Sequence, residues 1–359
     1  MSFRSFLTSI QNSAPRFLGA VFCSANLLAS TSCGKKNSTP EWETAAAKTQ
    51  PAEAAPAPKP EGAKPASAAH KSADAKPAAK TTAPTTEGLR FMTYNVENWL
   101  TMDRYVDGKN LKGAPKPKKE KQAVVSILAR HQPDVLGLCE VGEASDLAEI
   151  QEKLKQAGLN LPHRHYTGGT DPTRHLGILS RFPITSTAKP AETEYQLDGK
   201  TYGINRGILD ATIDARGKSY RFIGVHLKSK RDSEQGDQEA IRLHEARLLR
   251  RHLDSIFKAS NDARLVVYGD FNDTRSTPAI KAVTGNYNDP TYLTAIPAKD
   301  SHGEAWTHFW ALNDIYSRID FVMVSPALKR EVSFPAAKVI DDTDWNDASD
   351  HRSVLAEFK

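Results

Sequence analysis

Side chains that can bind metals or transfer protons occur at the ends of several apolar segments of this sequence. They are Asn95, Glu140, His226, Asp270, Asn272, Asp320, Asp350 and His351. The ends of neighbouring strands meet at one edge of a sheet, so we expect these side chains to form a single site. A carboxylate in apolar surroundings is costly unless it is paired or bound to a metal. The pattern therefore indicates acid–base or metal chemistry.

Each of these residues, taken singly, also has a purely structural interpretation. Asn95 and Asp270 are typical of turns, and Asp270 is also typical of a helix cap. His226 is typical of a hydrogen-bonded histidine in a core, and Asp320 could pair with the arginine two residues before it. Glu140 is the hardest to explain structurally, because its preceding neighbours are apolar and no Lys or Arg is adjacent.

Strand and helix patterns alternate along the part of the chain that must position these residues. The sequence predicts strands at 89–96, 134–141, 175–185, 206–214, 219–228, 265–269, 319–324 and 354–358, and helices at 118–131, 145–157 and 234–257. Strands mixed with helices over this length predict one α/β domain, residues 88–359, in which helices cover central sheets.

The composition restricts the class of protein. Of the 359 residues, 25% are charged and 39% are hydrophobic, and the mean hydropathy is −0.52. These values exclude a polytopic membrane protein, a fully disordered chain and a fibrous repeat. The net charge of +5 comes mainly from residues 1–88, so charge alone does not indicate a nucleic-acid partner for the rest. Cys139 has no other cysteine within residues 34–359, so this part cannot form an internal disulfide.

The first 33 residues have the pattern of an export signal. Arg4 and Arg16 precede an apolar stretch, 17–29, that is short for a membrane-spanning helix and normal for a signal peptide. Small residues then lead to Cys33, as at the cleavage site of a bacterial lipoprotein. We therefore predict an exported protein that is held at the outer surface of a membrane by a lipid on Cys33. The alternative is ordinary signal cleavage and a secreted protein.

Residues 34–87 are dominated by Ala, Pro, Lys, Thr and Ser. Such a segment cannot bury enough apolar surface to offset its chain entropy, so the sequence predicts a disordered linker. The simplest role of this linker is to hold the domain of residues 88–359 away from a membrane.

Five short motifs follow one another across residues 89–359. They are 94–98 (YNVEN), 134–140 (DVLGLCE), 269–272 (GDFN), 317–321 (SRIDF) and 349–351 (SDH). In this order they resemble the endonuclease/exonuclease/phosphatase superfamily, the deoxyribonuclease I-like proteins, and 226–230 (HLKSK) resembles its secreted bacterial members. The resemblance implies a four-layer α/β sandwich, in which two packed mixed sheets are flanked by helices.

The resemblance also implies a site for a divalent cation. Glu140 would be the principal ligand, with Asn95 close by, and Asp350 would hold a second cation if the site takes two. Mg²⁺ is the expected metal because hard cations prefer oxygen ligands, and Mn²⁺ and Ca²⁺ are the alternatives. The sequence contains no Cys/His cluster that would indicate a structural zinc.

The remaining motif residues take acid–base and binding roles through the resemblance. His351 would be the general base that takes a proton from the attacking water, and Asp320 would hold its imidazole in the productive tautomer. Asp270 would orient or protonate at the reacting centre. Asn272 would donate a hydrogen bond to a phosphoryl oxygen, and His226 would stabilise the charge that gathers on the phosphoryl oxygens.

Basic residues near these motifs predict contacts to phosphate groups. Lys228 and Lys230 alternate with His226, so the three side chains could lie on one strand face, with Arg231 next. A second basic run fits either a solvated face or contacts to a polyanion, and it consists of Lys112, Lys116, Lys118, Lys119 and Lys121.

Two departures from known subgroups limit the choice of substrate. The first motif lacks the Trp-Asn-x-Asn-Gly pattern of the apurinic endonucleases, and the residues after Glu140 also differ from that group. The two cysteine pairs of the animal secreted enzyme are absent as well. Repair of abasic DNA and the stabilisation of the animal enzyme therefore do not carry over.

The sequence thus predicts an exported, divalent-metal-dependent phosphodiesterase with extracellular nucleic acid as its leading substrate. The alternative is the same chemistry on a phospholipid or small phosphoester, as in the sphingomyelinases and inositol-phosphate phosphatases of the superfamily. A lipid enzyme would need an exposed apolar hairpin, for which 285–312 is the candidate. Trp306, Phe309 and Trp310 fit either stacking on a base or core packing. A third hypothesis is a surface lipoprotein that binds a phosphorylated ligand without turnover. We predict a monomer with no protein partner.

Overall fold

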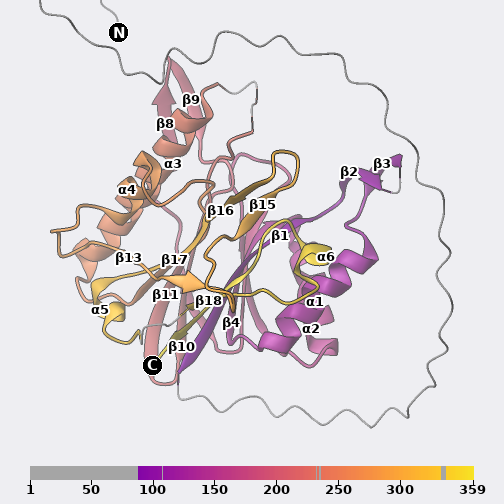
Figure 1. Cartoon of the computed structure of the whole chain (residues 1–359). Helices are drawn as coiled ribbons and strands as arrows, with labels where there is room; N and C mark the ends of the chain where they lie inside the picture. Colours follow the sequence, from indigo (N-terminus) through magenta and orange to yellow (C-terminus); the bar gives the residue numbers. More distant parts are fainter. Residues whose placement is uncertain (1–87, 107, 232, 234–235, 333–336) are drawn as a thin grey trace, which may run out of the picture. The chain divides into compact units, whose positions relative to one another are not determined.

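The computed structural model describes residues 88–359 with gaps at 107, 232, 234–235 and 333–336 (Figure 1). The predicted signal peptide, residues 1–33, and the predicted linker, residues 34–87, lie outside the described residues. Among the described helices, none is long and apolar enough to cross a membrane.

A seven-stranded mixed sheet carries the first and last strands of the domain. Strand β1 pairs in parallel with β4 and antiparallel with β19. The sheet order is β14 (Ala298–Lys299), β18 (Ala337–Val339), β19 (Val354–Phe358), β1 (Leu89–Trp99), β4 (Val135–Val141), β6 (His175–Ser180) and β5 (His163–Thr167). The motifs at 94–98 and 134–140 therefore lie on neighbouring strands.

A six-stranded mixed sheet carries the other motifs. Strand β11 pairs in parallel with β12, and β12 pairs antiparallel with β17. The sheet order is β13 (Thr294–Ala295), β17 (Asp320–Val324), β12 (Leu265–Asp270), β11 (Lys218–His226), β10 (Ile208–Ala215) and β7 (Ile184–Thr187). Asp270 and Asp320 are register partners on β12 and β17.

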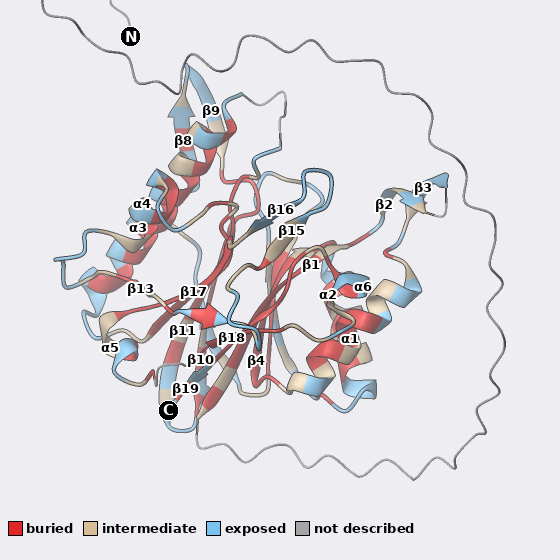
Figure 2. Ribbon diagram, viewed as in Figure 1, coloured by how far each residue is buried: buried red, intermediate tan, exposed pale blue. Residues whose placement is uncertain are grey.

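The two sheets pack face to face around a shared apolar interior (Figure 2). The ring of Phe91 on β1 lies 5.0 Å from the ring of Phe222 on β11 and 4.8 Å from the ring of Tyr268 on β12. Gly137 on β4 allows this approach, because a Cβ there would lie 2.0 Å from the Tyr268 ring. Strands buried on both faces need apolar residues throughout, which explains the continuous apolar runs in the sequence.

Helices cover the outer faces of both sheets. On the seven-stranded sheet, α1 (Lys118–His131) and α2 (Ala144–Gln156) bury their apolar sides, and the short α6 (Trp345–Ala348) lies beside α1. On the six-stranded sheet, α3 (Gln238–Ala259) and α4 (Pro278–Thr284) form the corresponding layer. The short α5 (Pro326–Lys329) follows β17. The predicted α/β fold with two mixed sheets and covering helices is confirmed.

Three two-stranded hairpins project from this framework: β2 (Met102–Val106) with β3 (Lys109–Ala114), β8 (Glu194–Leu197) with β9 (Lys200–Gly203), and β15 (His308–Trp310) with β16 (Ile315–Ser317). The sequence predicted none of their strands, although the segment named as a candidate apolar hairpin, 285–312, overlaps β15. Their strands are short and mostly exposed, so they lack the apolar alternation that identifies a strand.

One predicted strand is wrong as a single element. The segment 175–185 divides into β6 and β7, which belong to different sheets. Arg181 accounts for the break, because its backbone N–H and its guanidinium both bond to Asp134. Pro183 lies in the connection, and proline cannot donate to a strand ladder. The predicted helix 234–257 also begins later, at Gln238, where the Asp237 carboxylate caps it.

Candidate active site

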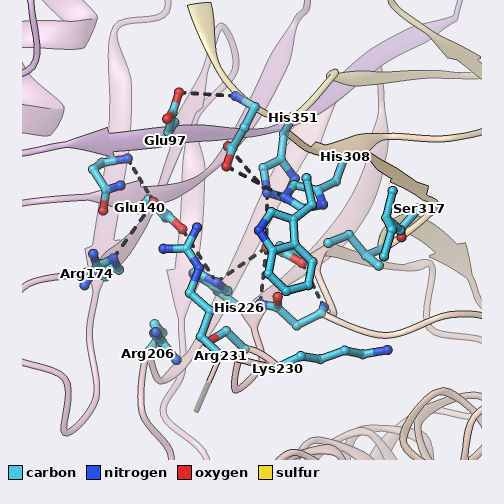
Figure 3. A pocket seen from close by; sticks show the side chains of 18 residues that line it. Glu97, Glu140, Arg174, Arg206, His226, Lys230, Arg231, His308, Ser317 and His351 are labelled. Carbon is cyan, nitrogen blue, oxygen red and sulfur yellow. Dashed lines mark hydrogen bonds and ion pairs between the residues drawn. The ribbon is translucent and has the colours of Figure 1, made fainter. Parts of the chain in front are cut away.

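The strand ends bring most of the predicted site residues into one pocket of about 360 Å³ (Figure 3). Those that line it are Glu140, His226, Lys230, Asp270, Asn272, Asp350 and His351. Asn95 and Asp320 are buried directly behind this lining and contact it. Lys228 does not belong to the lining.

At the ends of β4 and β12 the backbone has positive φ values, which residues other than glycine rarely adopt. Glu140 and Asn272 have φ values of 63° and 50°. Gly269 has a φ of 128°, and a Cβ there would lie 1.9 Å from the Val225 carbonyl oxygen. Strained conformations of this kind persist where the surrounding structure holds them, and they cluster at functional sites. Here they redirect Glu140 and Asn272 into the pocket.

His351 and Asp320 form a directed pair. The His351 Nδ1–H donates to Asp320 Oδ2 over 2.9 Å, and the Thr307 hydroxyl donates to the same oxygen over 2.7 Å. This tautomer leaves Nε2 of His351 as the free nitrogen, with Asn95 Nδ2 at 3.4 Å. Burial opposes a charge on His351, but the negative charges of Asp320 and Asp270 outweigh it and raise the His351 pKa well above its ordinary value.

Asp270 is a carboxyl group whose proton affinity suits neutral pH. Burial raises the pKa of Asp270 to about 7, and the charges of Asp320 and Glu140 add to the increase against the opposing effect of His351. The Asn272 backbone N–H donates to Oδ1 over 2.8 Å, and Asn95 Nδ2 donates to Oδ2 over 3.1 Å. A group of this pKa can accept or supply a proton near pH 7.

The amide nitrogen of Asn95 contacts Glu140, Asp270 and His351 at once. Nδ2 lies 3.3 Å from Glu140 Oε1, 3.1 Å from Asp270 Oδ2 and 3.4 Å from His351 Nε2. The carbonyl oxygen of the same side chain accepts the Glu97 backbone N–H over 3.0 Å. In this orientation Asn95 donates hydrogen bonds to the reacting groups, whereas a cation ligand would have to offer its oxygen.

Four carboxylates line the pocket and can serve as ligands of a cation. They are Glu97, Glu140, Asp270 and Asp350. Burial and repulsion from Asp350 raise the pKa of Glu97 to about 7 despite the nearby Lys116. Among the described residues, two sets place their ligand atoms within 4.8 Å of one another: His308, Asp350 and His351, and Asp270, Asp320 and His351. Both sets include the His351 imidazole, and Glu140 belongs to neither. The oxygen donors that fit a hard divalent cation are the four carboxylates of the lining.

Glu140 and Asp350 are held differently at the pocket wall. Glu140 Oε2 accepts the Asn98 backbone N–H over 2.9 Å, while Oε1 lies 3.9 Å from His226 Nε2. Burial would raise the pKa of Asp350, but the nearby imidazoles of His308, 3.7 Å away, and His351 lower it to about 2. Asp350 is therefore an anion at neutral pH and can serve a cation as a ligand.

His226 is uncharged in this pocket. Burial, followed by the positive charges of Arg206, His351 and Arg174, lowers the His226 pKa well below its ordinary value. Its Nε2 lies 3.5 Å from Asp270 Oδ2, and its Nδ1 is buried without a hydrogen bond. A neutral imidazole can stabilise negative charge only by donating a hydrogen bond. His226 would therefore perform its predicted role by donating an N–H to a phosphoryl oxygen.

Several pocket residues were not among the predicted site residues. They are Glu97, Asn98, Arg174, Arg206, Ser229, His308, Ile315, Ser317 and Ile319. Glu97 lies inside the first motif, so its position two residues after Asn95 was an available signal. His308 pairs with His351 across a β-bridge, with ring centroids 4.6 Å apart. No sequence signal identifies Arg174, Arg206 or His308, which reach the pocket from loops and a hairpin.

The two lysines of 226–230 lie in different surroundings. Strand β11 ends at His226, so Lys228 lies beyond the regular strand; it is buried, and its backbone N–H donates to Glu245 Oε2 over 2.6 Å. Lys230 reaches the pocket, and its Nζ lies 3.0 Å from Asp273 Oδ1. The expected common strand face is therefore wrong, because the strand ends before both lysines.

The second basic run is largely neutralised by acidic neighbours. Lys116 is fully buried, and its Nζ lies 3.0 Å from Glu120 Oε2. Three further ion pairs occur along the run: Lys112 with Asp103, Lys119 with Asp347 and Lys121 with Glu149. Lys116 lies neither on a solvated face nor where it could contact a polyanion, so both interpretations are wrong for this residue. Its charge pairs with Glu120 inside the fold.

Of the three aromatic residues singled out in the sequence, Trp306 and Phe309 pack against other side chains, and Trp310 lines the pocket. Trp306 packs against Arg352, whose guanidinium carbon lies 3.3 Å from the ring centroid. Phe309 stacks on Tyr316 at 4.4 Å. Trp310 lines the pocket. The β15–β16 hairpin that carries it exposes large apolar side chains, namely Trp310, Leu312, Ile315 and Tyr316.

The fold and the site together define a class of protein. Two packed mixed sheets present carboxylate, imidazole and guanidinium groups at their strand ends, a set suited to phosphoester hydrolysis. The sequence pattern of the Endonuclease/Exonuclease/phosphatase family matches residues 92–351. The chain belongs to this family and is a phosphoric ester hydrolase. No curated protein matches the chain.

Solved structures with a similar fold carry different names. A family protein from Bacteroides vulgatus is 17% identical with a TM-score of 0.56, and the match covers 76% of this chain and 98% of that one. Sphingomyelinase C from Streptomyces griseocarneus is 16% identical with a TM-score of 0.53, covering 76% and 100%. A mutant of beta toxin from Staphylococcus aureus with bound magnesium ions is 15% identical with a TM-score of 0.52, covering 76% and 100%. At these identities the likeness shows the fold alone.

Proposed function

We propose that this protein is a divalent-metal-dependent phosphodiesterase that hydrolyses nucleic acid outside the cell. One observation carries the proposal: the acid–base groups share their pocket with four cationic side chains, Arg174, Arg206, Lys230 and Arg231. A polyanion places phosphate groups on both sides of the bond that is cleaved, so cationic groups around the reacting centre suit it. Trp310 at the same pocket offers a flat surface for a base.

The side chains of the site supply the proton transfers of hydrolysis. In its deprotonated form, His351 takes a proton from the attacking water at Nε2, and Asp320 holds the ring in the required tautomer and stabilises the imidazolium. Asp270, with a pKa of about 7, supplies a proton to the leaving oxygen as the phosphorus–oxygen bond breaks. Water and a phosphodiester thereby become a phosphomonoester and an alcohol. His226 donates a hydrogen bond to a phosphoryl oxygen. Asn272 Nδ2 donates to the Leu227 carbonyl oxygen over 3.0 Å and to Asp270 Oδ2 over 3.3 Å, and it exchanges the longer of these bonds for one to a phosphoryl oxygen.

Glu140 and Asp350 are the residues that would hold the cation, with Mg²⁺ the leading choice. A bound cation would neutralise charge that gathers on the phosphoryl oxygens. The magnesium ions in the structure of the beta toxin mutant support this choice of metal.

The decisive experiment uses plasmid DNA and a structured RNA as substrates. We expect the purified protein to degrade nucleic acid with Mg²⁺, to lose this activity with EDTA, and to lose about 10²–10⁴-fold in rate in His351→Ala. Intact nucleic acid after incubation with a folded, metal-loaded protein would refute the proposal. Wild-type hydrolysis that disappears in His351→Ala would also eliminate the hypothesis of ligand binding without turnover.

A second candidate function, hydrolysis of a phospholipid, is favoured by the exposed apolar β15–β16 hairpin. Leu312 is 89% exposed and Tyr316 53% exposed, beside a pocket that Trp310 and Ile315 line. Apolar groups on a hairpin at the mouth of a site can enter a lipid surface. Release of choline phosphate from sphingomyelin vesicles, reduced in Leu312→Ser but with unchanged cleavage of a soluble phosphodiester, would establish this function in place of the first.

We further propose that the protein is exported and held at a membrane surface by a lipid on Cys33. The support is the sequence pattern of residues 1–33. In a bacterial host, the wild-type chain should fractionate with membranes and Cys33→Ala should become soluble. Equal fractionation of the two chains would contradict the anchor and leave the hydrolase proposal untouched.

A further inference from the structure

A fully buried lysine lies behind the pocket. Lys116 comes shortly before α1, and its side chain is 0% exposed. Lysine is almost never fully buried unless its charge is paired, because removing an ammonium group from water is costly. Its Nζ lies 3.0 Å from Glu120 Oε2 and 3.7 Å from Glu97 Oε2. An apolar side chain of the same length would fill this space without that cost, so packing alone does not explain the ammonium group.

Lys116 also binds the backbone of a strained segment near the end of β1. Its Nζ donates to the Glu97 carbonyl oxygen over 3.1 Å. Glu97 and Asn98 have φ values of 46° and 58°, in the left-handed region that residues other than glycine rarely adopt. Strained conformations persist only where the surrounding contacts hold them. The bond from Lys116 is one such contact for these two residues, the 97–98 segment.

Arg104 on β2 binds the next carbonyl groups of the same backbone. Its Nη2 donates to the carbonyl oxygens of Asn98 and Leu100, over 2.5 and 2.9 Å. Two cationic side chains therefore bind consecutive carbonyl oxygens, those of Glu97 and Asn98. Because hydrogen bonds to charged donors are stronger than neutral ones, these contacts fix the direction of the peptide groups in the 97–98 segment.

The 97–98 segment in turn contacts both residues that would hold the cation. The Asn98 backbone N–H donates to Glu140 Oε2 over 2.9 Å. The Asp350 backbone N–H donates to Glu97 Oε2 over 3.2 Å (Figure 3). Glu140 lies near the end of β4 and Asp350 before β19, so this segment joins two distant parts of the chain. A shift of its peptide groups would change the separation of the two ligand carboxylates.

We propose that Lys116 and Arg104 are positioning residues for the cation site: through the 97–98 segment, they hold the Glu140 and Asp350 carboxylates at the separation that a divalent cation requires. Groups that orient metal ligands without touching the metal affect metal affinity strongly. The inference deepens the proposed function, because it rests on the proposed cation ligands. It does not depend on which phosphoester is the substrate.

Charge and position predict opposite effects of Lys116 on metal binding. A positive charge near the pocket repels a cation, so removing the charge alone should tighten the binding of Mg²⁺. Losing the hydrogen bond to the Glu97 carbonyl oxygen should weaken the binding, because the ligands lose their fixed separation. The direction of the change in Mg²⁺ affinity therefore distinguishes the two roles.

The first test is Lys116→Met, which keeps an unbranched side chain and removes the ammonium group. In calorimetric titrations of the purified protein with Mg²⁺ alone, we expect the dissociation constant to rise about tenfold. The increase in melting temperature that a fixed Mg²⁺ concentration produces should shrink accordingly. Lys119→Met is the matched control, because it removes an exposed charge, paired with Asp347, from the same basic run. This control should keep the wild-type affinity.

Arg104→Met keeps the inference testable if Lys116→Met does not fold. Arg104 lies on the β2–β3 hairpin and is only partly buried, so its loss should disturb the core less. The substitution removes the bonds to the Asn98 and Leu100 carbonyl oxygens and should also weaken Mg²⁺ binding. Circular dichroism of the metal-free proteins shows whether each variant is folded.

Unchanged or tighter Mg²⁺ binding in either folded variant would overturn the inference and leave the proposed function standing. A lower melting temperature of the metal-free variant with wild-type Mg²⁺ affinity would have the same meaning, because it would show a merely structural role. A wild-type protein that binds no Mg²⁺ would refute both the inference and the proposed metal dependence. Weaker binding in the variants, without any cleavage of nucleic acid by the wild type, would support the inference and refute only the proposed nuclease activity.

Discussion

At the scale of single residues, the pairing of His351 with Asp320 decides which nitrogen of the imidazole is available to water. The two side chains come from β17 and from the segment before β19, which belong to different sheets. Thr307 adds a second donor to the same oxygen of Asp320. Asp320 is therefore a positioning residue: it acts on the substrate only through His351.

Replacing Asp320 by Asn should change both the rate and its pH dependence. Asp320 raises the pKa of His351, so its removal should lower this pKa and move the acid limb of the kcat/KM profile to lower pH. Loss of the productive tautomer should reduce kcat by about 10²–10⁴-fold. Thr307→Val removes the hydrogen bond to Asp320 and the acceptor of the Ile319 and Asp320 backbone N–H groups, but it keeps the Asp320 charge and should reduce kcat less. An unshifted acid limb in Asp320→Asn would contradict the role.

Among the site residues, Glu140 should have the largest effect on the Mg²⁺ concentration that the activity requires. Glu140→Gln replaces a carboxylate by a neutral amide, which is a weaker ligand for a hard cation. We expect the Mg²⁺ concentration for half-maximal activity to rise at least tenfold while the thermal unfolding of the metal-free protein stays nearly unchanged. Glu152→Gln, an exposed change on α2, should leave the metal titration as in wild type. An unaltered titration in Glu140→Gln would remove Glu140 from the metal site.

At the scale of elements, a buried charge cluster ties α3 to the six-stranded sheet. Asp210 on β10 accepts hydrogen bonds from Arg221 on β11, over 2.8 and 2.6 Å, and lies 2.7 Å from His252 Nε2 on α3. Burial alone would raise the pKa of Asp210, but the hydrogen bonds from His252 and Arg221 hold it below the ordinary value. The same helix carries Glu245, so this cluster also stabilises the pocket wall.

Asp210→Asn should destabilise the fold by about 2–3 kcal/mol near pH 7, because it leaves a partly buried arginine without its anion. The lowered pKa means that the carboxylate stabilises the folded state above the pKa of the unfolded chain, near 4, and that this contribution is lost as the pH falls through the folded-state value. The difference between wild type and variant in urea unfolding should therefore shrink below about pH 4. Asp214→Asn, exposed on the same strand, should change stability by less than about 0.5 kcal/mol. If the stability lost in Asp210→Asn were the same at every pH, the ionised Asp210 carboxylate could not be its cause.

At the scale of the whole molecule, Tyr268 is the side chain on which the two sheets meet. Glycines face its ring from both sheets: a Cβ at Gly137 would lie 2.0 Å from it, and a Cβ at Gly224 would lie 2.7 Å from the hydroxyl oxygen. The Tyr268 hydroxyl is buried and makes no hydrogen bond. The packing of the sheets therefore needs the ring, while the hydroxyl costs stability.

Tyr268→Phe should raise the free energy of unfolding by about 1 kcal/mol, because it removes a buried polar group without a partner. Tyr166→Phe is the matched comparison, since the Tyr166 hydroxyl donates to the Gly142 carbonyl oxygen over 2.9 Å, and this change should lower stability. Urea unfolding of each variant measures whether its free energy of unfolding rises or falls relative to wild type. A loss of stability in Tyr268→Phe would show that the hydroxyl has a partner such as a bound water.

The residues that could carry the chemistry, and the places where the main strands end, were predictable from the amino-acid sequence. Apolar runs and period-two patterns are local, and burial of a strand on both faces imposes them directly, so 134–141, 265–269 and 319–324 were predicted as strands. The carboxylates, histidines and amides at these ends were predicted to converge, because strand ends share an edge of a sheet.

The further groups that face the reacting centre are evident only from the folded chain. Arg174, Arg206 and His308 lie on loops and a hairpin whose positions depend on contacts between segments far apart in the chain, such as Asn205 with Glu245. The same packing buried Lys116 and Lys228, which the sequence presented as surface charges. A side chain's burial and partners depend on the elements packed around it, and the spacing of residues along one segment carries no information about them.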